Sequence, residues 1–410
     1  MTKLAMSLLL VAFLAGPVAG DPQYAAIDAQ DAPRSATSSV QALADYLAGS
    51  AETDRGKARA IFTWIAKHVA YDITRYGEPP DAENVLATRR AVCAGYAKLF
   101  AALAEAAGLE TVVIHGDAKG IGPPAAIDAD GLLNHDWNAV RIEGQWHLLD
   151  CTWGAGYLDK YGRFVREFRD HYFLTPPQLF AYDHLPREEK WQLLASPLTR
   201  NTFLSQPTVQ PAFFRYGLRF RSHPLGRIEA QGSLTVAFDA PEDTMLMAEL
   251  YQYGAVLEEH QTFAQPEASG FAIHVFLPST GEYMLRVYAR RRNSGELEYD
   301  SAVEYKIHNT EPGAGRFPKM YGSFQERACY LAKPLSGELP EGAVDFALRV
   351  PDAEDVRVVV NGLSHRLNRN GSDGFSGTVN VEPGFAVVYA RFPGRARYDG
   401  LLRYAVGQAP

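Results

Sequence analysis

Three residues of the types used in nucleophilic catalysis stand in the first half of the chain: Cys93, His135 and Asp150. A cysteine thiolate attacks carbonyl carbons, a histidine takes the thiol proton, and a carboxylate orients the histidine. Cys93 begins a segment with helical periodicity, and a helix N-terminus has unpaired N–H groups and partial positive charge that favour a thiolate. Its backbone N–H could also hold an oxyanion. The alternative for Cys93 alone is a buried, inert thiol.

The spacing of His135 and Asp150 fits a β-hairpin. Glu143-Gly144 is typical of a two-residue turn, which would place Trp137 opposite Asp150 and His135 opposite Thr152. Side chains alternate along strands, so His135 and Asp150 would share a face, with Cβ atoms about 7 Å apart or less. An imidazole–carboxylate hydrogen bond can bridge that distance. The alternative is a solvated pair, but Trp137 on the same face favours a packed one.

Helical and extended patterns alternate around these residues. Apolar side chains at helical spacing predict helices over Ala58–Val69 and from about Val92 to Ala107, which Gly108 ends. Strand-like segments follow at Thr111–His115, His135–Ile142 and Gln145–Cys151. This half of the chain is therefore predicted to be α+β.

The second half has a different pattern. From about residue 205, short alternating apolar segments are separated by Gly, Pro and Asn-Gly, which is typical of antiparallel β-sandwiches. The pattern also repeats: HPLGRIEAQG (His223–Gly232) matches KPLSGELPEG (Lys333–Gly342), and VYAR (Val287–Arg290) recurs at Val388–Arg391. We therefore predict two consecutive sandwich modules.

The N-terminus has the features of a signal peptide. Lys3 precedes the apolar segment Leu4–Gly16, and Val18-Ala19-Gly20 supplies small residues for cleavage before Asp21. A membrane anchor is the alternative, but the apolar segment is shorter than the about 20 residues that a spanning helix needs. We expect an exported protein, periplasmic or secreted, with no membrane span after signal cleavage.

The chain has only three cysteines, Cys93, Cys151 and Cys329. An oxidising compartment favours paired cysteines, and three cannot all pair within one chain, so a free thiol there calls for a reason such as catalysis. We predict a packed thiol for Cys151, with a disulfide to Cys329 or a redox role as alternatives.

The length of the chain indicates its domain organisation, and its charge bears on nucleic-acid binding. Its 410 residues predict several domains: a signal peptide (1–20), a leader without a core (21–36), a core domain (37–205) and two modules (210–309 and 320–408). The net charge of −8, without a block of like charges, argues against nucleic-acid binding.

Five further histidines in the first half of the chain are candidate metal ligands. They show no metal-ligand spacing with each other or with the cysteines, so we predict neither a metal nor a cofactor. These are His68, His115, His147, His171 and His184.

Three segments in one order resemble the transglutaminase-like superfamily: WIAKHVAYD (Trp64–Asp72), VCAGYAKLFAALAEAAGL (Val92–Leu109) and HDWNAVRIEGQWHLLDCTWGAG (His135–Gly156). The resemblance covers roughly residues 36–200. It implies a papain-like fold and a catalytic triad of Cys93, His135 and Asp150. Ala91 replaces the Gly that is frequent two residues before the cysteine, and Cys151 replaces the small residue or Pro that is frequent after the aspartate.

The segments that follow narrow the resemblance. Tyr172–Phe203 and Arg215–Gly226 are similar to kyphoscoliosis-peptidase-type proteins, which carry β modules after a transglutaminase-like core. The predicted architecture is thus an α+β papain-like core followed by two antiparallel β-sandwich modules.

Three further residues are candidates for the site. Trp137 and Trp153 flank it, either as walls of an acyl pocket or as packed core side chains. Asn84 precedes the Cys93 helix and could donate to an oxyanion, or it could be a turn residue.

The resulting hypothesis is an exported cysteine enzyme that hydrolyses amide or peptide bonds through a thioester. The alternatives are a cross-linking transglutaminase and a non-catalytic protein-binding scaffold. The expected partner is a protein or peptide substrate, with a cell-envelope component among the candidates, against which the β modules would position the enzyme.

Overall fold

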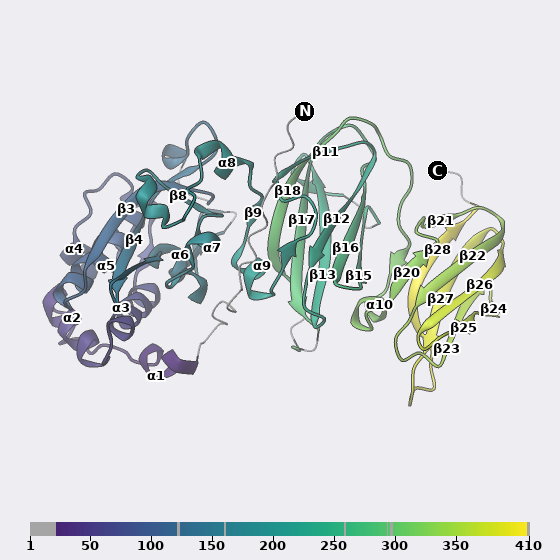
Figure 1. Cartoon of the computed structure of the whole chain (residues 1–410), viewed down its shortest axis with the longest axis horizontal. Helices are drawn as coiled ribbons and strands as arrows, with labels where there is room; N and C mark the ends of the chain where they lie inside the picture. Colours follow the sequence, from purple (N-terminus) through teal and green to yellow (C-terminus); the bar gives the residue numbers. More distant parts are fainter. Residues whose placement is uncertain are drawn as a thin grey trace. The chain divides into compact units, whose positions relative to one another are not determined.

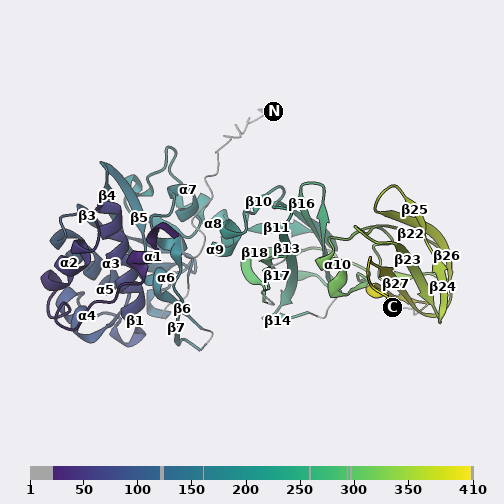
Figure 2. The same ribbon diagram turned by 90° about the horizontal axis from the view of Figure 1, so that it is seen from below.

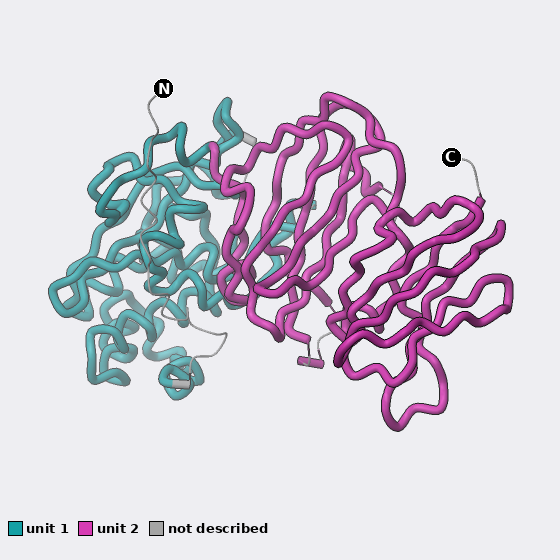
Figure 3. Tube along the Cα trace, turned by 45° about the vertical axis from the view of Figure 1, so that its right-hand side comes forward, with its two compact units in different colours: residues 1–204 teal, residues 205–410 magenta. Residues whose placement is uncertain are grey.

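The computed structural model describes residues 22–120, 124–159, 161–257, 260–292, 294–295 and 298–407. The predicted signal peptide lies outside these residues. The chain divides into two compact units, residues 1–204 and 205–410 (Figure 3). In the described part of the chain, none of the helices has the length and apolar character needed to cross a membrane.

The first unit is an α+β domain built on a four-stranded antiparallel sheet of order β5-β4-β3-β8. The Cys93 helix, α5, packs against β3 and β4 (Figure 1). The helices are α1 (Ala25–Asp28), α2 (Val40–Gly49), α3 (Asp54–His68), α4 (Ala82–Thr88), α5 (Cys93–Ala106), α6 (Cys151–Ala155), α7 (Pro177–Phe180) and α8 (Arg200–Ser205). The strands are β1 (Ala70–Tyr71), β2 (Arg90–Ala91), β3 (Thr111–Ala118), β4 (Leu133–Ile142), β5 (Gln145–Leu149), β6 (Gly156–Leu158), β7 (Phe164–Arg166) and β8 (His184–Pro186).

The β4–β5 hairpin has the predicted register. Ile142 pairs with Gln145 across a two-residue turn, in which Glu143 and Gly144 adopt φ of 52° and 80°. Positive φ at both positions is what this type of tight turn requires. The hairpin therefore directs His135 toward the end of β5, where Asp150 follows.

The strand ends earlier than the sequence indicated. β5 stops at Leu149, and Asp150 becomes the N-cap of α6 because its Oδ1 accepts hydrogen bonds from the backbone N–H groups of Thr152 and Trp153. Such a cap turns the chain into a helix. The predicted placement of Thr152 opposite His135 on a strand is therefore wrong.

The sequence predicted that residues 21–36 form a leader without a core. In the structure, part of this segment is packed into the first unit. Tyr24 is 8% exposed and packs against Phe173, and α1 lies beside α3 (Figure 2). Arg59, on α3, is fully buried between Asp28 of α1 and Asp170. Since isolated apolar residues have no periodicity, the pattern of residues 21–36 gave no sign of this packing.

The second unit contains two β-sandwiches. In the first, the sheet β10-β12-β16-β15 faces the sheet β11-β18-β17-β13-β14, with β9 also paired to β18. Its strands are β9 (Thr208–Val209), β10 (Arg219–Phe220), β11 (Arg227–Ala230), β12 (Ser233–Asp239), β13 (Thr244–Gln252), β14 (Ala255–Val256), β15 (Thr262–Glu267), β16 (Gly270–Phe276), β17 (Gly281–Arg291) and β18 (Asp300–Asn309). A short helix, α9 (Pro211–Arg215), precedes β10.

The second sandwich repeats this topology. Its sheets are β20-β22-β26-β25 and β21-β28-β27-β23-β24. β19 pairs with β28 as β9 pairs with β18, and β21 pairs with β28 as β11 pairs with β18. Its elements are β19 (Lys319–Met320), α10 (Gly322–Glu326), β20 (Tyr330–Lys333), β21 (Glu338–Leu339), β22 (Gly342–Arg349), β23 (Asp355–Val360), β24 (Leu363–Arg366), β25 (Asn368–Asn370), β26 (Gly374–Val381), β27 (Gly384–Arg391) and β28 (Asp399–Val406).

Details of the pairing also repeat. The register shifts once within each VYAR segment, between Val287 and Tyr288 and again between Val388 and Tyr389. Each sandwich has one parallel pair, β11 with β18 and β21 with β28, among otherwise antiparallel strands. The predicted fold class is confirmed, whereas the predicted domain bounds stay a prediction.

The buried Arg59 gives a test of the fold. Replacing it in Arg59→Met leaves the Asp170 carboxylate buried without its cation, and breaking a buried pair on one side costs about 3–5 kcal/mol. Arg141→Met removes an exposed pair with Glu110 and is the matched control, expected to cost about 0–1 kcal/mol. The measurement is the free energy of unfolding in urea. Equal losses in the two variants would contradict the structural role of Arg59.

Candidate active site

Cys93 is the first residue of α5, as the sequence predicted, and its side chain is almost fully buried. No side chain among the described residues caps this helix. The Val92 carbonyl accepts the N–H groups of Gly95 and Tyr96, which begin the helical ladder behind the cysteine. A thiolate at Cys93 would therefore face an uncapped helix N-terminus, whose partial charge stabilises an anion.

Close packing holds this first turn in place. A Cβ on Gly95 would lie 2.6 Å from the Cβ of Ala91. Ala91 therefore fits at its position because residue 95 has no side chain. Ala91 itself is buried in β2. This packing shows how the chain accommodates Ala91, two residues before the cysteine.

His135 and Asp150 meet as the hairpin geometry predicted. His135 Nε2 lies 2.8 Å from Asp150 Oδ2, and the two side chains are 1% and 0% exposed. Burial alone would lower the pKa of His135, but the charge and hydrogen bond of Asp150, with help from Cys93, raise it to about 10. Burial likewise favours a neutral Asp150, yet His135 and His184 hold its pKa well below the usual range. The site therefore favours an imidazolium–carboxylate pair.

The second nitrogen of His135 is available to the cysteine. Nε2 is engaged by Asp150, and the buried Nδ1 has no partner at full hydrogen-bond geometry in the described structure. Cys93 nevertheless lies close enough to help raise the pKa of the imidazole. Thiol–imidazole contacts of catalytic pairs are often loose without a substrate. The arrangement suits proton exchange between Cys93 and Nδ1.

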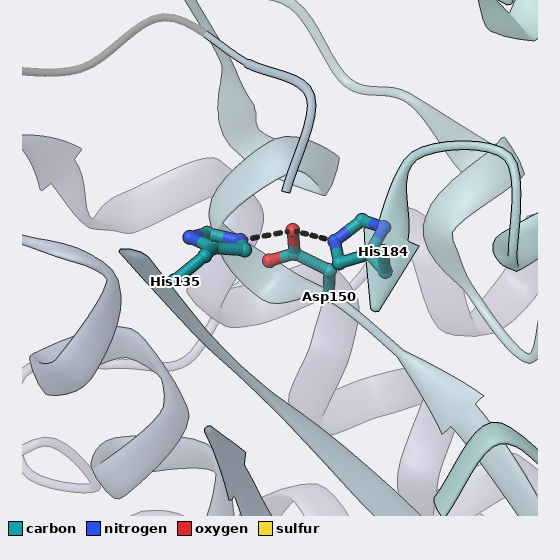
Figure 4. A group of neighbouring side chains, drawn as sticks. All are labelled: His135, Asp150 and His184. Atoms are coloured by element: carbon teal, nitrogen blue, oxygen red, sulfur yellow. Dashed lines mark hydrogen bonds and ion pairs between the residues drawn. The ribbon is translucent and has the colours of Figure 1, made fainter. Parts of the chain in front are cut away.

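A second histidine completes the cluster. His184, from β8, lies with Nε2 3.3 Å from Asp150 Oδ2 and with Nδ1 2.6 Å from Asp183 Oδ1 (Figure 4). The sequence pattern makes His184 no more than a candidate metal ligand and does not predict its place beside Asp150. The adjacent acid and histidine at 183–184 were the available signal, but the three-residue strand that carries His184 has too little periodicity to place it.

A small cavity opens beside His135. Its volume is about 30 Å³, enough for one or two water molecules, and it is mostly lined by aromatic and apolar side chains. The lining residues are Tyr71, Leu133, His135, Thr152, Trp153, Gly156, Tyr157, Leu158 and Phe164. Tyr71, Leu133, Tyr157, Leu158 and Phe164 are apolar or aromatic residues whose spacing in the sequence does not mark them as site residues.

The three further candidate site residues, Trp137, Trp153 and Asn84, have different positions in the structure. Trp153 lines the cavity and stacks on His135 at 5.1 Å between ring centroids. Trp137 is buried, lies 6.0 Å from the His135 ring and packs against His184, but is not part of the cavity lining. Asn84 is an exposed residue of α4 rather than a turn residue before Cys93. The geometry therefore favours Trp153 as a wall and gives Asn84 no support as an oxyanion donor.

The other two cysteines share the burial of Cys93. All three are unpaired in the structure, and Cys151 and Cys329 are both buried. Burial raises the pKa of the Cys151 thiol well above its usual range and that of Cys329 to about 12. These two cysteines are therefore inert thiols under ordinary conditions.

His135, Asp150 and His184 also meet the geometric condition for a metal site, since their ligand atoms lie within 4.8 Å of one another. The spacing of these three residues in the sequence does not predict this grouping. A divalent cation would have to displace the proton that His135 shares with Asp150, and the raised pKa of His135 opposes that loss. The described residues therefore fit a hydrogen-bonded network better than a metal centre.

Comparison with known proteins decides the family. Residues 41–151, which include Cys93, His135 and Asp150, match the family model of the transglutaminase-like superfamily. The first unit is a transglutaminase-like domain. Residues 200–318 match the model of the KY-like, immunoglobulin-like domain, which covers the first sandwich. The resemblance seen in the sequence is thereby confirmed.

Three relatives of known name are similar to this transglutaminase-like chain. Kyphoscoliosis peptidase of Homo sapiens is 30% identical over 294 residues, 70% of this chain and 43% of that protein. Hillarin of Drosophila melanogaster is 31% identical over 65% of this chain and 37% of its own. The Lim and transglutaminase domain protein ltd-1 of Caenorhabditis elegans is 27% identical over 67% and 41%. The chain thus spans less than half of the length of these relatives.

The His135–Asp150 pair predicts how stability depends on pH. The pKa of His135 is raised from 6.5 to about 10 on folding, so its contribution is complete below about pH 6.5 and is lost toward about pH 10. The pKa of Asp150 is lowered, so its contribution is lost on acidification below about pH 4. In a Cys93→Ala background, which keeps the larger contribution of Asp150 and loses the smaller one of Cys93, the free energy of unfolding should therefore decline from pH 6.5 toward a limit below pH 10, by at most about 1.4 kcal/mol per pH unit.

Asp150→Asn in that background should flatten this decline, as measured by urea unfolding at each pH. The matched control is Asp136→Asn, which breaks the His115–Asp136 pair on the same sheet, where the histidine side chain is 60% exposed. That control should keep the slope. A decline that persists unchanged in Asp150→Asn would show that the buried pair does not cause it.

Proposed function

We propose that this transglutaminase-like chain is an exported cysteine-dependent acyl-transfer enzyme that hydrolyses amide or peptide bonds. One observation supports this proposal above the others: a buried imidazole–carboxylate pair stands beside a cysteine at an uncapped helix N-terminus. Burying such a pair costs free energy, which a purely structural core can avoid with apolar residues. In this proposal Cys93 is the nucleophile, His135 the general base and acid, and Asp150 the orienting carboxylate.

The first half-reaction forms a thioester. In the resting site His135 already carries the proton of Cys93 on Nδ1, and the Cys93 thiolate attacks the substrate carbonyl carbon to form a carbon–sulfur bond. The N–H groups at the start of α5 are placed to stabilise the oxyanion. The carbon–nitrogen bond then breaks as His135 delivers its proton to the leaving amine. Asp150 keeps the proton on Nε2 throughout, so that Nδ1 is the nitrogen that exchanges protons.

The second half-reaction restores the enzyme. His135 takes a proton from water, the resulting hydroxide attacks the thioester, and the carbon–sulfur bond breaks to release the acid and the Cys93 thiolate. We propose water as the acceptor; an amine acceptor would instead give cross-linking. We propose a protein or peptide substrate, including cell-envelope peptides, in a periplasmic or secreted setting.

Hydrolysis of an activated ester tests the proposed chemistry without knowledge of the natural substrate. Cys93→Ala should abolish turnover, and Asp150→Asn should reduce it by up to about 10⁴-fold, as the corresponding change does in a serine protease. Cys329→Ala, which removes a buried cysteine of the second unit, is the control and should keep full turnover. Turnover that survives in Cys93→Ala would remove this cysteine from the mechanism.

The β-sandwiches are proposed to hold a large substrate rather than to add chemistry, since linked binding modules raise the local concentration of their target. A chain that ends at Leu204, where the first unit ends, should keep the reactivity of Cys93 toward a small alkylating probe. It should lose most of its binding to envelope or extracellular proteins in a pull-down with the full mature chain as reference. Equal capture by both chains would reject this role for the sandwiches.

A further inference from the structure

One buried ionisable side chain near the site has no part in the mechanism above. His184 is fully buried, and its Nε2 approaches the same Asp150 oxygen, Oδ2, that receives His135. Figure 4 shows the two imidazoles on opposite sides of the carboxylate. Histidine is fully buried less often than apolar residues are. Its position suggests that it acts on Asp150.

His184 is itself held from its other nitrogen. Its Nδ1 lies 2.6 Å from Asp183 Oδ1, and the Tyr172 hydroxyl donates to Asp183 Oδ2 at 3.1 Å. Both ring nitrogens of His184 therefore face carboxylates. An imidazole placed between two carboxylates donates from both nitrogens when it carries both ring protons.

Packing fixes the plane of the His184 ring. Phe180 stacks on it with a centroid distance of 4.0 Å, and Trp153 and Trp137 contact it at 4.5 Å and 4.9 Å. The ring can therefore neither turn away from Asp150 nor exchange its two nitrogens without disturbing these aromatic neighbours.

The backbone places His184 equally tightly. β8 pairs with the end of β3, and a Cβ on Gly116 would lie 2.3 Å from the Leu185 carbonyl and 2.4 Å from the Trp137 ring. Only a residue without a side chain allows β8 to approach this closely. Gly116 thus admits the strand that begins with His184.

We propose that His184 is a positioning residue that, held by Asp183, donates to Asp150 Oδ2 and fixes the carboxylate for His135. This inference rests on the proposed function. The backbone N–H groups of Thr152 and Trp153 hold only Oδ1. His184 supplies the restraint that the other oxygen lacks, so that Oδ2 stays on the line to Nε2 of His135.

Two substitutions test the hydrogen bonds of His184 to Asp183 and to Asp150 one at a time. In His184→Asn the amide nitrogen takes the place of Nδ1 and keeps the bond to Asp183, but nothing reaches Asp150. In His184→Gln the amide nitrogen takes the place of Nε2 and keeps the bond to Asp150. The readout is the rate of Cys93 alkylation by iodoacetamide from pH 5 to 10 in the full mature chain, with the alkylated residue identified by mass spectrometry.

We expect His184→Asn to lower the alkylation rate at pH 6 about 10- to 100-fold, the range found when the outer partner of a histidine in a metal site is removed. His184→Gln should retain most of the rate. Above pH 9 the rates of all three chains should converge, because an ordinary thiol ionises there without help. A merely structural role would move the unfolding midpoint and leave this pH profile in place.

The controls separate failure of this inference from failure of the proposed function. His147→Asn and His147→Gln change a half-buried histidine of β5 and should leave the rate at pH 6 unaltered. A wild-type profile in His184→Asn, together with an impaired Asp150→Asn, would overturn the role of His184 and leave the triad intact. Wild-type profiles in both variants would instead overturn the triad.

If His184→Asn does not fold, Asp183→Asn tests the positioning role of His184 instead. Its amide oxygen still accepts from His184 Nδ1, but the negative charge is lost, so His184 no longer lies between two carboxylates. We expect a loss of alkylation rate at pH 6 in the same direction as for His184→Asn. A rate equal to that of the wild-type chain at this pH would overturn the proposal.

Discussion

The buried carboxylate of Asp150 is the interaction on which the site depends. A carboxylate with no exposed surface is stable only when its charge is balanced and its lone pairs are satisfied. Two backbone N–H groups at the start of α6 and two imidazoles meet that need. Because these donors come from β4, α6 and β8, the pair that would activate Cys93 forms only when the surrounding domain has folded.

A chain of hydrogen bonds and ion pairs links Asp150 to the N-terminal segment. The backbone N–H of Asp150 donates to the carbonyl of Tyr172 at 3.0 Å, and the neighbouring Asp170 forms an ion pair with Arg59. Arg59 in turn holds Asp28, and its guanidinium lies over the ring of Tyr24. The segment that follows the predicted signal peptide is therefore part of the structure that supports the site. Its removal would disturb buried ion pairs rather than release a free leader.

Much of this arrangement could be predicted because it depends on local chemistry. The Glu143-Gly144 turn sets the register of the hairpin, and the register places His135 near Asp150. The start of α5 at Cys93 follows from the apolar periodicity of that segment. The sandwich repeat was visible because alternating strands recur in one order, and the VYAR segments shift register at the same step.

The parts that escaped prediction depend on contacts between distant residues. His184 lies 34 residues after Asp150, on a strand too short to show a period, and Gly116 of a third strand admits it. Tyr24 is a single apolar residue in a polar segment, so its burial follows from partners that the local sequence does not contain. Thr152 was misplaced because a capping aspartate ends a strand without changing the alternating pattern before it.

The central claim is that Cys93 carries the acyl group. Intact-protein mass spectrometry after brief incubation with an activated acyl donor tests it directly, because a thioester adds the mass of the acyl group and hydroxylamine removes it. The account predicts one such adduct on the wild-type chain, located at Cys93 by peptide mapping, and a slower appearance of that adduct when His135 is replaced by alanine. An adduct on another residue, or one that forms equally fast without His135, would contradict the account.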